Sequence, residues 1–219
     1  MRMLVAACLA LSCGGQQRAA TSGPALEVKT YGPLGSKADS KAPNQAVILG
    51  TDDKDGSTIV PLPVAAGKTT VDAMFIRLAD RKNITGGMSA VKLATAPNPD
   101  GSVQVGVFEE LAGGAGPQWR AGVWVSAFVA ATTLNKDLTD FTFSATSGGY
   151  IDGASASGLI AAGFLASMTG APVATDVTMT GIINPDGTIG PVAGIPEKFL
   201  ASIDKGKKRI GYPIGMRMA

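Results

Sequence analysis

Residues 149–198 constrain the fold more than any other part of the chain. They begin with a glycine-rich turn containing Asp152-Gly153-Ala154-Ser155, continue into a segment rich in Ala, Gly and Ser, and end at Lys198. A serine at the point where such a turn enters a helix faces helix N–H groups that have no intrahelical acceptor. N–H groups of this kind can stabilise an oxyanion, so the position suits the nucleophile of an acyl transfer. Ser155 is therefore the candidate nucleophile.

The chain contains no histidine. This excludes a Ser-His-Asp triad, a Cys-His pair and a histidine-ligated metal site. If a hydroxyl is activated here, the base must be a carboxylate, or a lysine desolvated enough to be neutral part of the time. Lys198 is the leading candidate for that base.

Two short segments partly match a calcium loop and a phosphate-binding loop, but each lacks residues that the motif requires. The acidic turn at residues 52–56 lacks the first acid and the terminal glutamate of a calcium loop. Gly67-Lys68-Thr69 matches the end of a phosphate-binding loop, but Leu62 stands where that loop needs its first glycine. We therefore expect neither a cofactor nor a metal, and a net charge of +2 gives no reason to expect nucleic acid.

Three ordered motifs within residues 143–213 resemble the proteolytic domain of the Lon family of Ser-Lys proteases. Residues 152–156 resemble its Asp-Gly-Pro-Ser-Ala nucleophile motif, and Met179-Thr180-Gly181 resembles its Met-Thr-Gly strand. Lys198 falls where the catalytic lysine of the Gly-Gly-(Ile/Leu)-x-Glu-Lys motif sits, without an insertion or deletion. The sequence of residues 184–192, Asn-Pro-Asp-Gly-Thr-Ile-Gly-Pro-Val, most resembles that of the ATPase-free, Lon-like branch of the family.

The resemblance implies an α/β (α+β) fold in which mixed sheets pack with helices. It implies a serine-type endopeptidase that cleaves unfolded or flexible polypeptides through a Ser155–Lys198 dyad and an acyl-enzyme, without its own ATPase. Thr180 would orient the lysine, and backbone N–H groups around Gly153 and Ser155 would hold the oxyanion. Asp152 would shape the turn or, in a resting state, pair with Lys198. A homo-hexamer is also implied.

The chain departs from the family motifs at three small residues. Ala154 replaces a proline, and Ser157 and Ala193 replace glycines. A left-handed backbone at Ser157 or Ala193 would strain the site by roughly 1–2 kcal/mol. The alternative function is therefore an inactive Lon-like domain that binds peptides or scaffolds an assembly. A further alternative is the peptidase subunit of a machine with a separate ATPase.

The N-terminal part differs in composition from the rest. Residues 1–22 are typical of an export signal, with Arg2 before an apolar run, and Cys13-Gly14-Gly15 resembles a lipoprotein processing site. Residues 23–45 are rich in Gly, Pro, Ser and Lys and predict a flexible linker. Residues 46–219 form the expected proteolytic domain, which we expect to be short at its C-terminus. The expected location is exported: periplasmic, or anchored to a membrane by lipid.

Periodicity and turn residues predict the elements of this domain. Turns are expected at Gly86-Gly87 and at residues 98–101, within an antiparallel sheet. Trp124, Phe128 and Ala131 are expected to pack in the core. Strands are expected at 71–78, 89–95, 102–108, 140–146, 176–183, 188–192 and 209–213, and helices at 117–134, 155–169 and 195–205.

Overall fold

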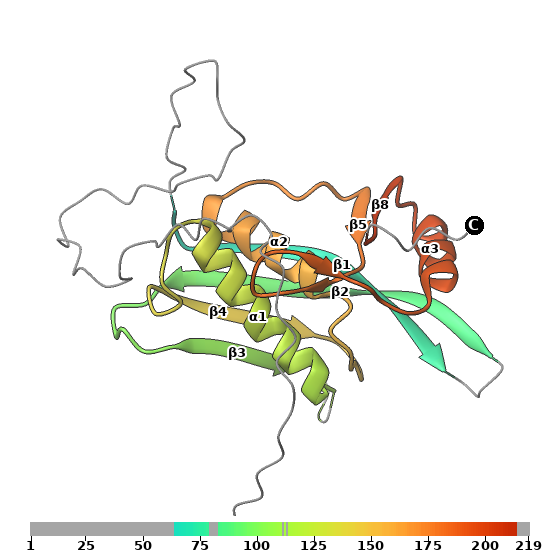
Figure 1. The fold of residues 1–219 in the computed structure, drawn as a ribbon, viewed down its shortest axis with the longest axis horizontal. Helices are drawn as coiled ribbons and strands as arrows, with labels where there is room; N and C mark the ends of the chain where they lie inside the picture. Colours follow the sequence, from blue (N-terminus) through green and yellow to red (C-terminus); the bar gives the residue numbers. More distant parts are fainter. Residues whose placement is uncertain (1–63, 79–82, 111, 113, 214–219) are drawn as a thin grey trace, which may run out of the picture. The chain divides into compact units, whose positions relative to one another are not determined.

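The computed structural model describes residues 64–78, 83–110, 112 and 114–213. The expected export signal, the linker and residues 46–63 lie outside them. The described elements are, in order, β1 (Gly67–Leu78), β2 (Ile84–Pro97), β3 (Gln104–Glu109), α1 (Pro117–Thr133), β4 (Phe141–Ser147), α2 (Ser157–Thr169), β5 (Val177–Met179), β6 (Ile182–Ile183), β7 (Ile189–Gly190), α3 (Ile195–Asp204) and β8 (Arg209–Gly211) (Figure 1). No helix in the described part is long and apolar enough to cross a membrane.

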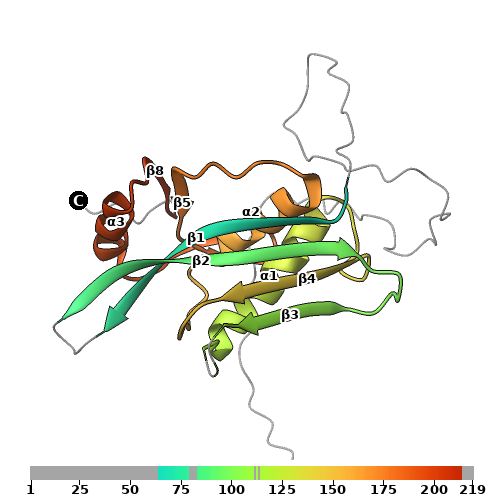
Figure 2. The ribbon, with the colours of Figure 1, turned by 180° about the vertical axis from the view of Figure 1, so that it is seen from behind.

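The main sheet has four strands in the order β1-β2-β4-β3, as Figure 2 shows from its open face. β1 and β2 form a long antiparallel hairpin, and β4 is antiparallel to β2. β3 runs parallel to β4, so the expectation of a purely antiparallel sheet was wrong at this strand. The cause is α1, which connects β3 to β4 and makes the crossover that a parallel pair requires. The mixed α/β class implied by the resemblance is confirmed.

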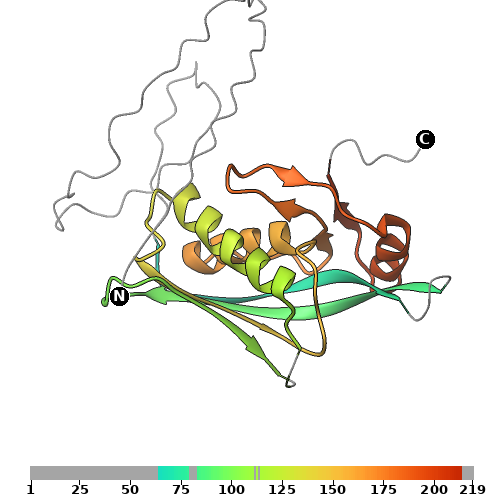
Figure 3. The same ribbon diagram turned by 60° about the horizontal axis from the view of Figure 1, so that its bottom comes forward.

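Helices α1 and α2 pack on one face of this sheet (Figure 3). Alternate residues of β4 are buried against them, with Phe143 and Phe164 in edge-to-face contact at 5.2 Å between ring centroids. Gly163 lets α2 lie close to the sheet, because it has no Cβ; a Cβ at this position would collide with Leu93. The expected core position of Ala131 is confirmed, but those of Trp124 and Phe128 were wrong: both side chains are about two-fifths exposed, at 43% and 40%, and Trp119 is buried instead.

The C-terminal elements pack at the other end of the hairpin. The Thr178 hydroxyl donates to the Asp72 carbonyl, and the Lys207 ammonium pairs with the Asp72 carboxylate. α3 lies on β2 where a Cβ on Gly86 would collide with the Glu197 carbonyl. The expected turn at Gly86-Gly87 was therefore wrong, because both glycines lie inside β2 and make room for neighbouring groups.

Two further differences concern the residues around the candidate nucleophile. α2 begins at Ser157, so Ser155 stays in the turn before it. The expected strand 176–183 is interrupted between β5 and β6. The Thr180 N–H still donates to Gly211 of β8, but the next N–H, that of Gly181, donates to the Ser155 carbonyl. This bond attaches the segment between β5 and β6 to the turn of residues 152–156, which contains Ser155 and is called the nucleophile turn below.

Candidate active site

Ser155 is held in its turn by backbone contacts on both sides. Gly153 has φ +102°, a conformation that residues with a side chain rarely adopt, so the turn needs glycine there. The Ser155 carbonyl accepts hydrogen bonds from the Gly181 N–H at 2.7 Å and from the Thr180 hydroxyl at 3.1 Å. The Ser155 backbone is therefore positioned by the segment that joins β5 to β6.

Lys198 reaches the same turn from the first half of α3. Gly194 precedes that helix with φ +69°, and a Cβ there would collide with Ile76. The Lys198 side chain is buried, with 2% of the residue exposed. Its Nζ donates to the Ser155 Oγ at 3.0 Å and to the Thr180 Oγ1 at 3.1 Å. The structure thus brings Ser155, Thr180 and Lys198 together.

The environment of Lys198 favours its neutral form. Burial lowers the pKa of its ammonium from 10.5 to about 8, because a charge loses its hydration there. None of the four ion pairs among the described residues includes Lys198. At pH 7 about a tenth of such lysines are uncharged, which is enough to provide a base.

Thr180 connects the two candidate catalytic residues. It is fully buried, and its hydroxyl accepts from the Lys198 Nζ while donating to the Ser155 carbonyl. Its own N–H donates to the Gly211 carbonyl at 3.0 Å, which ties it to β8. Because this hydroxyl both donates and accepts a hydrogen bond, it fixes the direction of the lysine amine.

The Asp152 carboxylate is bound to the start of α1, and none of the ion pairs among the described residues joins it to Lys198. Its Oδ1 accepts from the N–H groups of Gln118 at 3.0 Å, Trp119 at 3.2 Å and Gly153 at 2.8 Å. The first N–H groups of a helix lack intrahelical acceptors and favour a negative charge. Of the two roles expected for Asp152, the structure shows the shaping of the turn.

The expected oxyanion donors differ in how they are used. The Gly153 N–H is engaged by Asp152. The Ser155 N–H has no acceptor within the described part of the chain. One of the two expected donors is therefore free to receive an oxyanion, and the other must first leave the Asp152 carboxylate.

The strain considered at the departures from the family motifs is absent. Among the described residues, Asn135 is the only non-glycine residue with positive φ, so Ser157 and Ala193 are not left-handed. The buried Ser157 hydroxyl donates to the Ala154 carbonyl at 2.7 Å and accepts from the Ile183 N–H at 2.9 Å. Ser157 thereby holds the nucleophile turn against β6, a role for which the sequence carries no signal.

A cavity of about 520 Å³ opens beside the Ser155 and Lys198 side chains. Side chains from β1 and from the segment before α3 supply most of its apolar wall. Sequence reasoning missed them because they come from parts of the chain without a motif. The apolar lining residues are Phe75, Ile76, Ile182, Pro191, Val192 and Ala193.

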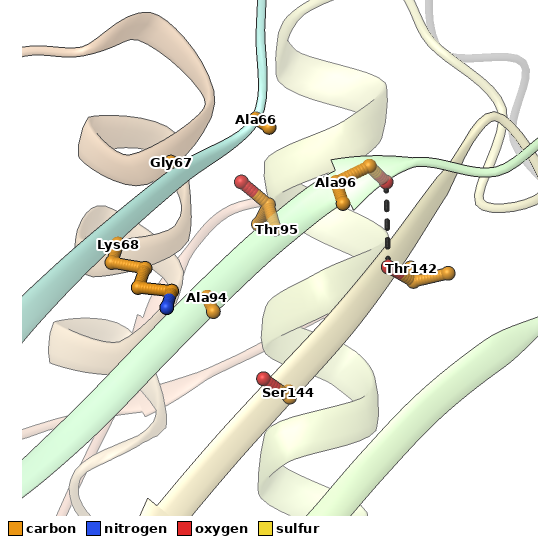
Figure 4. A pocket seen from close by; sticks show the side chains of 8 residues that line it. All are labelled: Ala66, Gly67, Lys68, Ala94, Thr95, Ala96, Thr142 and Ser144. Carbon is orange, nitrogen blue, oxygen red and sulfur yellow. Dashed lines mark hydrogen bonds between the residues drawn. The ribbon is translucent and has the colours of Figure 1, made fainter.

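A separate cavity of about 330 Å³ lies over β1, β2 and β4 and is lined by Gly67 and Lys68 (Figure 4). Both residues belong to β1, whereas a phosphate-binding loop places its glycine and lysine at the start of a helix. This cavity therefore does not have the geometry of a phosphate site. No group of three or more Cys, Asp or Glu side chains in the described residues could hold a metal.

Comparison with known proteins finds relatives of one kind. Residues 147–215, which include Ser155, Thr180 and Lys198, match the model of the Lon protease (S16) C-terminal proteolytic domain. A Lon protease from Rhizobium meliloti (strain 1021) is 40% identical over 62 residues. That alignment covers 28% of this chain and 8% of the relative, so the chain matches only a small part of that protein's length.

Proposed function

Because residues 147–215 belong to the Lon-type proteolytic domain family, we propose that this protein is a serine-type endopeptidase with a Ser155–Lys198 dyad. The observation that carries this proposal is the 3.0 Å hydrogen bond between a buried lysine amine and the hydroxyl of the turn serine. A buried lysine with a lowered pKa is suited to act as a base near neutral pH. Because the matched family consists of proteases, we infer that the bond attacked is a peptide bond.

The reaction begins with neutral Lys198. Its amine takes the proton of the Ser155 hydroxyl while Oγ attacks the peptide carbonyl carbon. The negative charge then moves to the carbonyl oxygen, where the Ser155 N–H can donate to it. Collapse of the tetrahedral intermediate breaks the C–N bond, and the Lys198 ammonium returns the proton to the leaving amine.

The acyl-enzyme is released by the same groups. Lys198, neutral again, takes a proton from water as the water oxygen attacks the ester carbonyl. The second intermediate collapses to a free carboxylic acid, and Ser155 Oγ recovers its proton from the lysine. Thr180 keeps the amine directed at Oγ in both half-reactions through its 3.1 Å contact with Nζ.

The substrate we propose is an unfolded or flexible polypeptide. The cavity beside Ser155 has apolar walls, which suit the apolar side chains that only an unfolded protein exposes in number. We propose that cleavage proceeds without an ATPase of its own. The inactive alternative loses its main support, because Ser157 and Ala193 lack the positive φ that would strain the site.

Export, lipid anchoring at Cys13 and assembly into a homo-hexamer remain parts of this proposal. Growth of the native host with a radioactive fatty acid tests the anchor, since an unlabelled mature protein would rule it out. Sedimentation of the purified chain tests the assembly.

Cleavage of casein by the purified chain tests the proposed activity. We expect the wild-type chain to produce peptides, and Ser155→Ala and Lys198→Ala to produce none. Lys205→Ala, which removes an exposed lysine just after the same helix, is the matched control and should cleave normally. Cleavage by either dyad variant would refute the assignment, and a wild-type chain without activity would favour the peptide-binding alternative.

A further inference from the structure

A second cavity of about 620 Å³ adjoins the one beside Ser155. It lies between the outer half of the β1–β2 hairpin and the loop from β4 to the nucleophile turn, residues 148–152. The two cavities share Phe75, Ile76 and Asp152 as lining residues. A molecule that reaches the nucleophile along β1 therefore passes from one cavity into the other.

Phe75 lines both cavities. Its ring lies over the bare backbone of Gly87, where a Cβ would collide with the ring. The Arg77 guanidinium lies over the same ring, 5.7 Å from its centroid. Both contacts favour this position of the ring.

The second cavity has the lining of a site for a large apolar side chain. Leu78, Met88, Tyr150 and Ile151 line it, beside the polar Arg77 and Ser89. Leu78 and Tyr150 are 65% and 79% exposed, although large apolar side chains are usually covered. Exposed apolar groups gathered around a hollow beside a reactive group are typical of a substrate-binding surface.

We propose that this cavity binds a large apolar or aromatic side chain of the substrate, at a position separated from the residue at the scissile bond. This inference rests on the proposed peptidase function and assigns it a second specificity site. In an extended chain, side chains two residues apart point the same way and lie about 7 Å apart. One extended polypeptide can thus fill both cavities, with Phe75 between its two side chains.

The inference is tested by filling the second cavity alone. Ser89 lines this cavity but not the one at the nucleophile. Ser89→Phe places a ring in it without touching the catalytic groups. Ala90→Phe is the matched control, because the neighbouring Ala90 is exposed and lines neither cavity. Thermal melts of both variants confirm that each remains folded.

Peptide affinity tests the second cavity independently of cleavage. The probes are fluorescein-labelled peptides in which each position in turn is Phe or Gly, measured by fluorescence polarisation on chains that also carry Ser155→Ala. We expect one position away from the central residue to favour Phe over Gly roughly ten-fold. Ser89→Phe should remove this preference, and Ala90→Phe should keep it.

Tyr150→Ala provides a second variant, since its exposed side chain can be removed without disturbing the core. It should weaken the same preference. Equal affinity for Phe and Gly at every outlying position, or the same profile in Ser89→Phe and Ala90→Phe, would overturn the inference. Labelling of Ser155 in the wild-type chain by a small fluorophosphonate tests the proposed function independently, because that reagent does not need the second cavity.

Discussion

The Lys198 amine and the Ser155 hydroxyl, which are 43 residues apart in the chain, are joined by a hydrogen bond of 3.0 Å. Two glycines make this possible. Gly153 allows the turn that presents the serine, and Gly86 lets α3 approach β2 closely enough to bury the lysine. The dyad therefore depends on backbone contacts that lie outside the two residues themselves.

Peptidase activity should rise with pH up to about 8. Only the neutral amine can accept the Ser155 proton, and burial lowers the Lys198 pKa to about 8. Below that value, kcat/KM should increase about ten-fold per pH unit, and above it the rate should level off. A series of initial rates from pH 6 to pH 10 on one quenched peptide measures this. A midpoint near 10.5, the ordinary lysine value, would show that the amine is solvated during catalysis.

Replacing Lys198 by Met should abolish activity and leave the protein at least as stable at pH 7. Folding buries an ammonium whose pKa falls from 10.5 to about 8, so below pH 8 the charged form opposes folding. Met removes the charge and keeps most of the volume, while Thr180 retains its bond to the Ser155 carbonyl. We expect a gain of about 1–3 kcal/mol in the free energy of unfolding.

Urea denaturation at two pH values checks this stability change. Between pH 8 and 10.5 the unfolded wild-type chain binds more protons at this lysine than the folded chain does, so this lysine's contribution to wild-type stability rises with pH there. The advantage of Lys198→Met should accordingly shrink at pH 10. A variant less stable than wild type at pH 7 would mean that the lysine's hydrogen bonds outweigh its desolvation.

Removing the Asp152 carboxylate should loosen the nucleophile turn without changing the lysine. Asp152→Ala leaves the N–H groups of Gln118, Trp119 and Gly153 without their acceptor. Loss of a helix cap costs about 1 kcal/mol, and kcat should fall as Ser155 loses its fixed position. Asp152→Asn, which retains a carbonyl oxygen, should restore most of the stability.

The pH–rate midpoint separates this positioning role from a direct charge pair. An Asp152–Lys198 ion pair would raise the lysine pKa, so its loss would move the midpoint to lower pH. Because the structure directs Asp152 toward α1, we expect the midpoint of Asp152→Asn to match that of the wild-type chain. A shift of one pH unit or more would instead indicate the paired resting state.

The motif residues could be located from the sequence because their signals are local. Asp152, Ser155, Thr180 and Lys198 each stand in a short pattern whose order and spacing matched one family, and the structure brings the last three together. The mixed α/β class was implied by the resemblance that these patterns carry, because a family match brings its fold with it.

The remaining features depend on partners distant in the chain. Strand β3 pairs with β4 rather than β2, which only the α1 crossover determines. Gly86-Gly87 resembles a turn in sequence, yet both residues lie in a strand. Glycine is needed there because a Cβ would collide with α3 at Gly86 and with the Phe75 ring at Gly87. The capping of α1 by Asp152, from more than thirty residues later, leaves no local pattern.

Removing the Thr180 hydroxyl should slow the reaction and move the pH–rate midpoint downward. Thr180→Val keeps the shape but deletes the acceptor for the Lys198 Nζ and the donor to the Ser155 carbonyl. A hydrogen bond to the ammonium stabilises the charged form, so its loss lowers the lysine pKa below about 8. The amine also loses its direction, and kcat should fall roughly five- to ten-fold, as for a lost hydrogen bond of about 1–1.5 kcal/mol.

Thr180→Ser separates this effect from a loss of packing. It restores the hydroxyl and removes only a methyl group, so it should recover the wild-type midpoint and most of the rate. Rates from pH 6 to pH 10 on one quenched peptide compare the three proteins. If Thr180→Val keeps the wild-type midpoint and rate, the amine is oriented by Ser155 alone, and Thr180 serves only to tie the nucleophile turn to β8.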